Sequence, residues 1–172
     1  MAKSTYLNRL ITQPYNKVRR RLLGQLVAGG GLAVALHTSV KAEENTLRFP
    51  GEEPPNKVVY QFNKSEADYH NSVLFSIGAM LRKYTDDIAI VVVCIGPGLQ
   101  ILAKKPTRPV AKETQERVSS LHQYGVKFVA CGNTMRSLKL TAEDLVPFAE
   151  IIDVGAAALM ELQHKGYAYI SW

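Results

Sequence analysis

An unbroken apolar run from Ile88 to Ile95 constrains the fold of this 172-residue chain more than any other feature of its sequence. A strand that faces water on one side alternates apolar and polar residues, whereas a strand covered on both faces of a parallel sheet does not. The run is rich in β-branched valine and isoleucine and shows no alternation. It therefore predicts a central strand of a parallel sheet, with helices packed against both faces.

Shorter apolar runs alternate with segments whose apolar residues recur at helical spacing. This alternation predicts an α/β protein with one open, doubly wound, mainly parallel five-stranded sheet, because right-handed helical crossovers must join its strands. Ser65 is expected to cap the first helix, Gly125 to end the second and Gly166 to end the last. The predicted strands span residues 58–62, 88–95, 126–130, 148–152 and 167–170, and the predicted helices 65–81, 112–124, 131–138 and 154–164, with a further helix start at Thr141.

The first 42 residues differ from the rest of the chain and predict a signal peptide. They contain seven basic residues and no acidic residue, and Arg19-Arg20-Arg21 precedes the apolar, glycine-rich segment Leu22 to Leu36. That segment is shorter than the roughly 20 residues that span a membrane, and Val40-Lys41-Ala42 offers the small residues that a signal peptidase recognises. The arginine pair before a modestly apolar run indicates the twin-arginine route, with cleavage near Ala42. An uncleaved membrane anchor and a cytoplasmic basic tail are the alternatives.

Removal of this segment changes the charge of the protein. The whole chain has 21 basic and 15 acidic residues, but the part beyond residue 42 keeps only 14 of the basic ones, so its formal charge is −1. No basic stripe remains to bind a phosphate backbone, which argues against nucleic acid as a partner. Residues 43–56 are expected to form a flexible, proline-rich leader, and residues 57–172 a single periplasmic domain without a membrane span.

Cys131 is the strongest candidate for chemistry. In a doubly wound sheet the functional site lies beyond the carboxyl ends of the strands, and Cys131 follows a predicted strand and begins a predicted helix. The N–H groups at a helix start stabilise a thiolate and lower the pKa of the thiol, so Cys131 is predicted to be a nucleophile. Gly132, Asn133 and Thr134 are predicted to bind the substrate, Gly132 by allowing close approach and the other two by hydrogen bonding. The alternative is a buried, unreactive cysteine.

Gly96-Pro97-Gly98 follows the central strand and is predicted to form the rim of the same pocket, with an ordinary turn as the alternative. It lacks the Lys-Ser or Lys-Thr pair of a phosphate-binding loop. No histidine pairs with a cysteine or an acidic residue at a metal-ligand spacing, so neither a metal nor a cofactor is expected. Cys94 is interpreted as a core thiol. If the strands follow the order 2-1-3-4-5, Cys94 and Cys131 lie on opposite sides of the first strand. Two strand spacings are roughly 9–10 Å, which is too far for a disulfide, so none is expected.

The region from Val58 to Ile170 resembles the DsrE/DsrF-like family of sulfur-relay proteins, through residues 91–99, 125–134, 143–147, 162–163 and 166–170. The resemblance implies a small flavodoxin-like fold, assembly into homotrimers or homohexamers, and a cysteine at the position of Cys131 that carries sulfur as a persulfide. Two features depart from the family. Ile95 stands where many relatives have histidine, and relatives are generally cytoplasmic, whereas the signal peptide predicts export.

These observations together predict an exported sulfur-binding or sulfur-transfer protein that holds sulfane sulfur as a persulfide on Cys131, acting as a sulfurtransferase or a carrier. Its partners would be a sulfur donor and an acceptor thiol, each a protein or a small sulfur species. The alternative is a non-catalytic, oligomeric module that binds a small ligand. A thiol redox protein is a third hypothesis, but the chain has no Cys-x-x-Cys, so a resolving cysteine would have to come from a neighbouring subunit.

Overall fold

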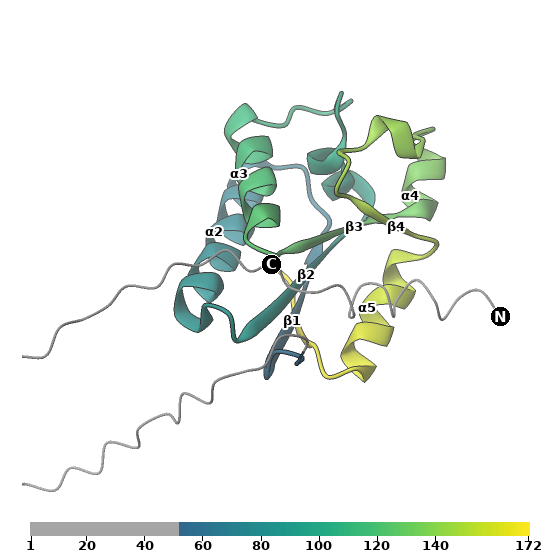
Figure 1. Ribbon diagram of the computed structural model, residues 1–172. Helices are drawn as coiled ribbons and strands as arrows, with labels where there is room; N and C mark the ends of the chain where they lie inside the picture. The colour runs from purple at the N-terminus through teal and green to yellow at the C-terminus, as the bar shows by residue number, and fades with distance from the viewer. Residues whose placement is uncertain (1–51) are drawn as a thin grey trace, which may run out of the picture.

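The computed structural model describes residues 52–172, which form an α/β fold around one five-stranded sheet (Figure 1). The predicted signal peptide, residues 1–42, and residues 43–51 of the predicted leader lie outside the described residues. All neighbouring strands pair in parallel, in the order β4-β3-β2-β1-β5. The strands are β1 (Asn56–Phe62), β2 (Ile88–Cys94), β3 (Lys127–Cys131), β4 (Glu150–Ile152) and β5 (Ala168–Ile170).

The predicted central strand is β2, which lies between β1 and β3 and has six of its seven residues buried. Side chains at alternate positions of β2 belong to two separate apolar clusters, one on each face of the sheet. Ile90, Val92 and Cys94 face one cluster, and Val91 and Val93 face the other. The absence of alternation in the sequence therefore reflects cover on both faces, and the predicted α/β class is confirmed.

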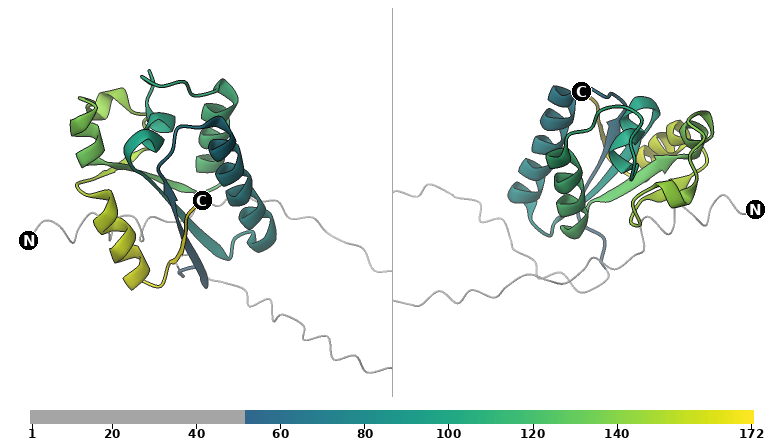
Figure 2. Two further views of the ribbon diagram at one scale, coloured as in Figure 1. Left: turned by 180° about the vertical axis from the view of Figure 1, so that it is seen from behind. Right: turned by 90° about the horizontal axis from the view of Figure 1, so that it is seen from above.

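Helices cover the two faces unequally (Figure 2). α2 (Ala67–Tyr84) and α3 (Lys112–Gln123) pack on one face, which we call the α2 face, and α5 (Gly155–His164) packs on the other, the α5 face. Three short helical segments complete the fold at the carboxyl end of the sheet: η1 (Gly96–Leu102), α4 (Gly132–Ser137) and η2 (Ala142–Asp144). No helix between residues 52 and 172 is long and apolar enough to cross a bilayer.

Most helix ends agree with the sequence, and one does not. Gly125 and Gly166 follow α3 and α5 with φ of 91° and 84°, the left-handed conformation that glycine adopts readily. Thr141 caps η2 through a capping box with Asp144. Ser65, however, does not cap α2, because the helix begins one residue later with Glu66 at its N-cap and without a side-chain cap. The Glu66 carbonyl accepts the first helical bond, from the His70 N–H at 3.0 Å.

The observed strand order differs from the order 2-1-3-4-5, on which the prediction of no disulfide is based. β2 and β3 are direct neighbours, so Cys94 and Cys131 are not separated by the first strand as the order 2-1-3-4-5 requires. Cys94 pairs with Ala130, and both face the α2 cluster. Cys131 is the next residue, so its side chain points to the α5 face. Both cysteines are buried. Both are also free, because the sheet lies between their side chains.

The Gly96-Pro97-Gly98 segment opens the 3₁₀ helix η1 and is more than a simple turn. Gly96 has φ of 54°, and Pro97 occupies the first turn, where its missing N–H costs nothing. A Cβ on Gly98 would lie 2.3 Å from the Phe62 carbonyl oxygen, so only glycine fits there. The close approach holds η1 against the end of β1 and thereby fixes one wall of the region beyond the strands.

Candidate functional site

The site forms where the connections that follow two neighbouring strands diverge. α4, which follows β3, places Met135 in the cluster of the α2 face, whereas α5, which follows β4, covers the α5 face. Such a divergence leaves the carboxyl ends of the two strands open between the helices, the usual place for ligands in open α/β sheets. Cys131 is the last residue of β3 and the N-cap residue of α4, and therefore lies at this point.

Hydrogen-bond donors from two helix starts surround the Cys131 sulfur. The backbone N–H of Gly155, the first residue of α5, donates to Sγ at 3.2 Å. Burial raises the pKa of the thiol, but the backbone N–H groups of Thr134, Gly155 and Asn133, with the Thr134 hydroxyl, stabilise the thiolate and outweigh burial. The pKa of Cys131 is therefore lowered, although the residue is only 3% exposed.

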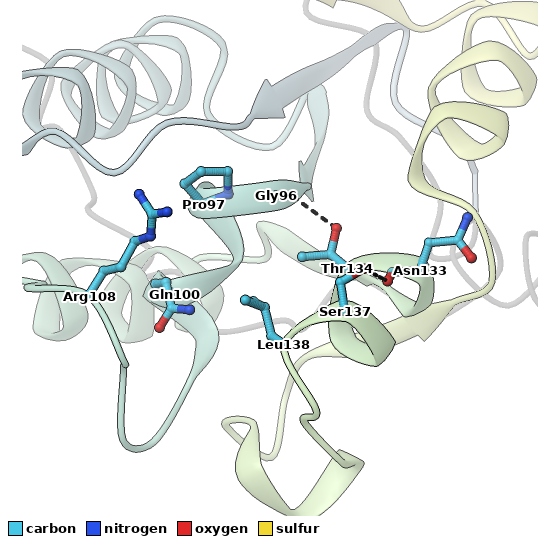
Figure 3. A pocket seen from close by; sticks show the side chains of 8 residues that line it. All are labelled: Gly96, Pro97, Gln100, Arg108, Asn133, Thr134, Ser137 and Leu138. Atoms are coloured by element: carbon cyan, nitrogen blue, oxygen red, sulfur yellow. Dashed lines mark hydrogen bonds between the residues drawn. The ribbon is translucent and has the colours of Figure 1, made fainter.

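Thr134 connects this thiol to the turn after β2. Its Oγ1 accepts a hydrogen bond from the Gly96 N–H at 2.9 Å (Figure 3). Its hydroxyl also interacts with the Cys131 sulfur. A hydroxyl that accepts from an amide keeps its own proton to donate, so it is available to the sulfur. Thr134 thus couples the end of β2 to the charge state of the thiol on β3.

Thr134 also lines an open pocket of about 270 Å³. Gly96, Pro97 and Gln100 line it from η1, and Arg108 lines it from the loop that leads to α3. Figure 3 shows Arg108 across the pocket from the residues that α4 contributes. α4 contributes Asn133, Thr134 and Ser137, and Leu138 lines the pocket from the end of this helix.

A buried glutamine holds the loop that carries Arg108. Gln100 is 1% exposed, and its side-chain amide bonds Thr107 twice. Its Oε1 accepts from the Thr107 N–H at 2.7 Å, and its Nε2 donates to Thr107 Oγ1 at 3.0 Å. Arg108 follows directly in the chain. The main chain next to Arg108 is therefore fixed to η1, although the side chain itself is exposed.

The structure brings together the two segments that were predicted to form the site, but the residues within them have different roles. Gly96, Pro97, Asn133 and Thr134 line the pocket. Gly98 and Gly132 are buried and serve close backbone packing, since a Cβ on Gly132 would lie 3.0 Å from the Ile152 carbonyl oxygen. Cys131 does not line the pocket, but Asn133 and Thr134, which donate hydrogen bonds to its sulfur, do. Sequence reasoning missed four lining residues: Gln100, Arg108, Ser137 and Leu138.

Cys94, His70 and His122 have packing or hydrogen-bonding roles in the fold. Burial on the α2 face raises the pKa of the Cys94 thiol, which is fully buried. His70 is also buried, bonds the Lys64 carbonyl oxygen at 3.1 Å and has a lowered pKa, chiefly because burial disfavours its charged form. His122 stacks on Phe148 at 4.3 Å between ring centroids. Within residues 52–172, no group of three or more His, Cys, Asp or Glu side chains could hold a metal ion.

Comparison with known proteins places these features in a family. A sequence profile of the DsrE/DsrF-like family matches residues 56–172. A protein of unknown function from Methanobacterium thermoautotrophicum, MTH1491, aligns with a TM-score of 0.61 and 23% identity over 68% of this chain and 99% of that chain. The ychN protein from E. coli aligns with a TM-score of 0.50 and 14% identity over 68% of this chain and 99% of its own.

A third structure, a conserved protein of unknown function from Bacteroides thetaiotaomicron, BT1422, aligns with a TM-score of 0.52 and 15% identity over 68% of this chain and 95% of that chain. At these identities the three structures establish the fold alone. No curated protein matches the chain. The arrangement around Cys131 must therefore be interpreted from its own geometry.

Proposed function

Because the chain belongs to the DsrE/DsrF-like family, we propose that it is an exported, oligomeric protein that carries sulfane sulfur as a persulfide on Cys131. The observation that carries the proposal is the set of donors around Sγ, which lowers the pKa of the Cys131 thiol despite its burial. Cysteine reacts as the thiolate, so these donors favour the form that attacks a sulfur donor. A persulfide anion at this position would meet the same donors.

The transfer involves two displacements at sulfur. The Cys131 thiolate attacks the terminal sulfane sulfur of a donor; a sulfur–sulfur bond forms, and the donor's bond to that sulfur breaks with the electron pair leaving on the donor. The product is a Cys131 persulfide anion. An acceptor thiolate then attacks the outer sulfur, takes it, and returns Cys131 to the thiolate. Each step conserves charge and needs no external oxidant or reductant.

Approach to the sulfur requires a local movement. Cys131 is 3% exposed, and Thr134 both contacts its sulfur and lines the open pocket. Rotation of a threonine side chain is fast compared with chemistry at a thiol. We expect a donor to enter through the pocket and reach Sγ when the Thr134 hydroxyl turns aside.

The test is the mass and location of a sulfur adduct. Incubation of residues 43–172 with polysulfide near neutral pH should add 32 Da, one sulfur, on the peptide that contains Cys131. Cys131→Ser should abolish the adduct and keep the fold, and Cys94→Ala should keep the adduct, because Cys94 is buried on the opposite face of the sheet. If wild-type protein gains no sulfur from any donor and iodoacetamide leaves Cys131 unlabelled, the carrier mechanism is wrong.

One observation favours a second candidate function, a non-catalytic module that binds a small ligand. The pocket is open and includes a charged side chain, whereas Cys131 is buried and does not line it. In that case Cys131→Ser would leave ligand affinity unchanged. Under the carrier proposal, the same variant abolishes sulfur uptake whether or not the pocket is occupied.

A further inference from the structure

We propose that the pocket beside Thr134 binds a small oxyanion that carries a terminal sulfane sulfur, and that Arg108 selects this class of donor. The sulfur chemistry of this inference rests on the proposed function of Cys131, whereas the anion site itself does not. Its starting point is that Arg108 is the single charged residue among the eight that line the pocket.

The charge of Arg108 has no partner within the described part of the chain. Its guanidinium makes neither an ion pair nor a hydrogen bond to any residue between 52 and 172, in contrast to the Lys112–Glu116 pair nearby in sequence. Guanidinium groups offer a planar fork of N–H donors that matches the oxygens of carboxylates, phosphates and sulfonates. An uncompensated fork at a pocket therefore favours an oxyanion over a neutral ligand or a cation.

Two further features make this a prepared site. Gln100 fixes the adjacent Thr107 with two hydrogen bonds, so the main chain that carries Arg108 is ordered before a ligand arrives. On the far side, Asn133 accepts a hydrogen bond from Arg136 through Oδ1. Figure 3 shows the Asn133 amide beyond Thr134, pointing away from Arg108. The residues that line the pocket include no carboxylate that would repel an anion.

Size and wall chemistry limit the ligand further. A volume of about 270 Å³ lies below the range of roughly 300–1,000 Å³ that suits drug-sized ligands and cofactors. Pro97 and Leu138 form apolar walls between the two polar sides. Such walls suit a weakly hydrated atom such as a sulfane sulfur better than a hydroxylated ligand. A small ion with one oxyanion end and one sulfur end fits these constraints.

The arrangement also orients the reaction. With the oxyanion at Arg108, the sulfur end can point to Thr134, which contacts the Cys131 sulfur. For thiosulfate, the Cys131 thiolate attacks the outer sulfur, a sulfur–sulfur bond forms, and sulfite leaves with the electron pair of the broken bond. Three negative charges enter and three leave, one on the persulfide and two on sulfite. Arg108 would hold the group that becomes the leaving anion.

Thiosulfate is the probe for the test, with residues 43–172 of the wild-type protein, Arg108→Met, Arg108→Lys and the control Arg117→Met. Arg117 is exposed on α3 and does not line the pocket. The second-order rate of the 32 Da mass gain with thiosulfate should fall about 10- to 100-fold in Arg108→Met, because a charge-assisted hydrogen bond is lost. Arg108→Lys should recover part of it, Arg117→Met should equal wild type, and iodoacetamide labelling of Cys131 should be the same in all four.

A binding measurement separates failure of this inference from failure of the carrier function. Sulfite titrated into Cys131→Ser should shift the amide NMR signals of Gly96 and Thr134, and Arg108→Met in that background should remove the shifts. If sulfite binds but thiosulfate delivers no sulfur, the anion site stands and the carrier function fails. If thiosulfate delivers sulfur equally to wild type and Arg108→Met, or if sulfite produces no shifts, the anion site is wrong.

Discussion

Thr134 shows how one hydroxyl can link two parts of a site. It accepts from the Gly96 N–H and contacts the Cys131 sulfur, so it both fixes the turn after β2 and stabilises a thiolate on β3. A backbone N–H of the same residue contributes to the lowered pKa of the thiol. The backbone contribution would survive a change of side chain, whereas the hydroxyl contribution would not, and this difference can be measured.

Thr134→Val keeps the side-chain shape and removes the hydroxyl. We expect it to raise the pKa of Cys131, so that the rate of iodoacetamide labelling reaches half of its plateau at a higher pH than in wild type. The Gly96 N–H also loses its acceptor, which should cost about 1–3 kcal/mol of unfolding free energy. Thr134→Ser, which keeps the hydroxyl, is the control. A labelling profile that is unchanged in Thr134→Val would show that backbone donors alone set the pKa.

At the scale of elements, the contact between η1 and β1 depends on the absence of a side chain at Gly98. A Cβ there would lie 2.3 Å from the Phe62 carbonyl oxygen, and main chain cannot move aside as a flexible side chain can. Gly98→Ala should therefore destabilise the fold by about 1–3 kcal/mol or more, seen as a lower midpoint in urea unfolding.

Gly78 provides a matched control within α2. An added Cβ there would meet only the tip of Arg82, at 3.4 Å, which is an ordinary contact. Gly78→Ala should stabilise the protein by about 0.5–1 kcal/mol, because alanine is the better helix former. If Gly98→Ala leaves the urea midpoint as high as in wild type, the interpretation of Gly98 is wrong.

The elements also show where sequence reasoning succeeds. Apolar runs mark all five strands, because burial on one or both faces of a sheet leaves a local pattern; for example, the strand predicted at 126–130 is β3, Lys127–Cys131. Strand order leaves no local pattern, since it depends on which edge each crossover reaches. The order 2-1-3-4-5 was therefore a poor basis for the distance between Cys94 and Cys131.

The same distinction applies to the pocket. Cys131 and Thr134 could be predicted as candidates because they follow a strand directly. Arg108 could not, because it reaches the pocket only after η1 and a loop fold back over the strand ends. The signal that could have indicated this loop is Gln100, a polar residue within the apolar stretch 99–103. A polar residue in such a stretch is expected to have a hydrogen-bond partner when buried.

At the scale of the whole molecule, the β5 edge of the sheet predicts assembly. Among the strands of residues 52–172, β5 pairs only with β1, and Tyr169 and Trp172 at this edge are 41% and 54% exposed. Exposed aromatic side chains beside a strand whose outer edge is unpaired favour contact with another chain. Light scattering of residues 43–172 at micromolar concentration should give a trimer or hexamer mass, and Tyr169→Lys combined with Trp172→Lys should shift it toward monomer. A monomer mass for the wild-type protein would contradict the prediction.

Export is a second prediction at this scale, and it depends on residues 1–42. Amino-terminal sequencing of protein from a periplasmic fraction should begin at or near Glu43. Replacement of Arg19 and Arg20 by lysine should block export, because the twin-arginine route requires the pair. A soluble cytoplasmic protein with an intact Met1 or Ala2 terminus would argue against both the route and the cleavage.

The opposite orientation of Cys94 and Cys131 has a consequence for how long a bound sulfur lasts. The chain has two cysteines, and the sheet keeps the second one out of reach of the first. A persulfide formed on Cys131 therefore meets no thiol of its own chain that could reduce it or close a disulfide. Its lifetime would depend on encounters with a second molecule, so the rate of discharge would rise with the concentration of the acceptor.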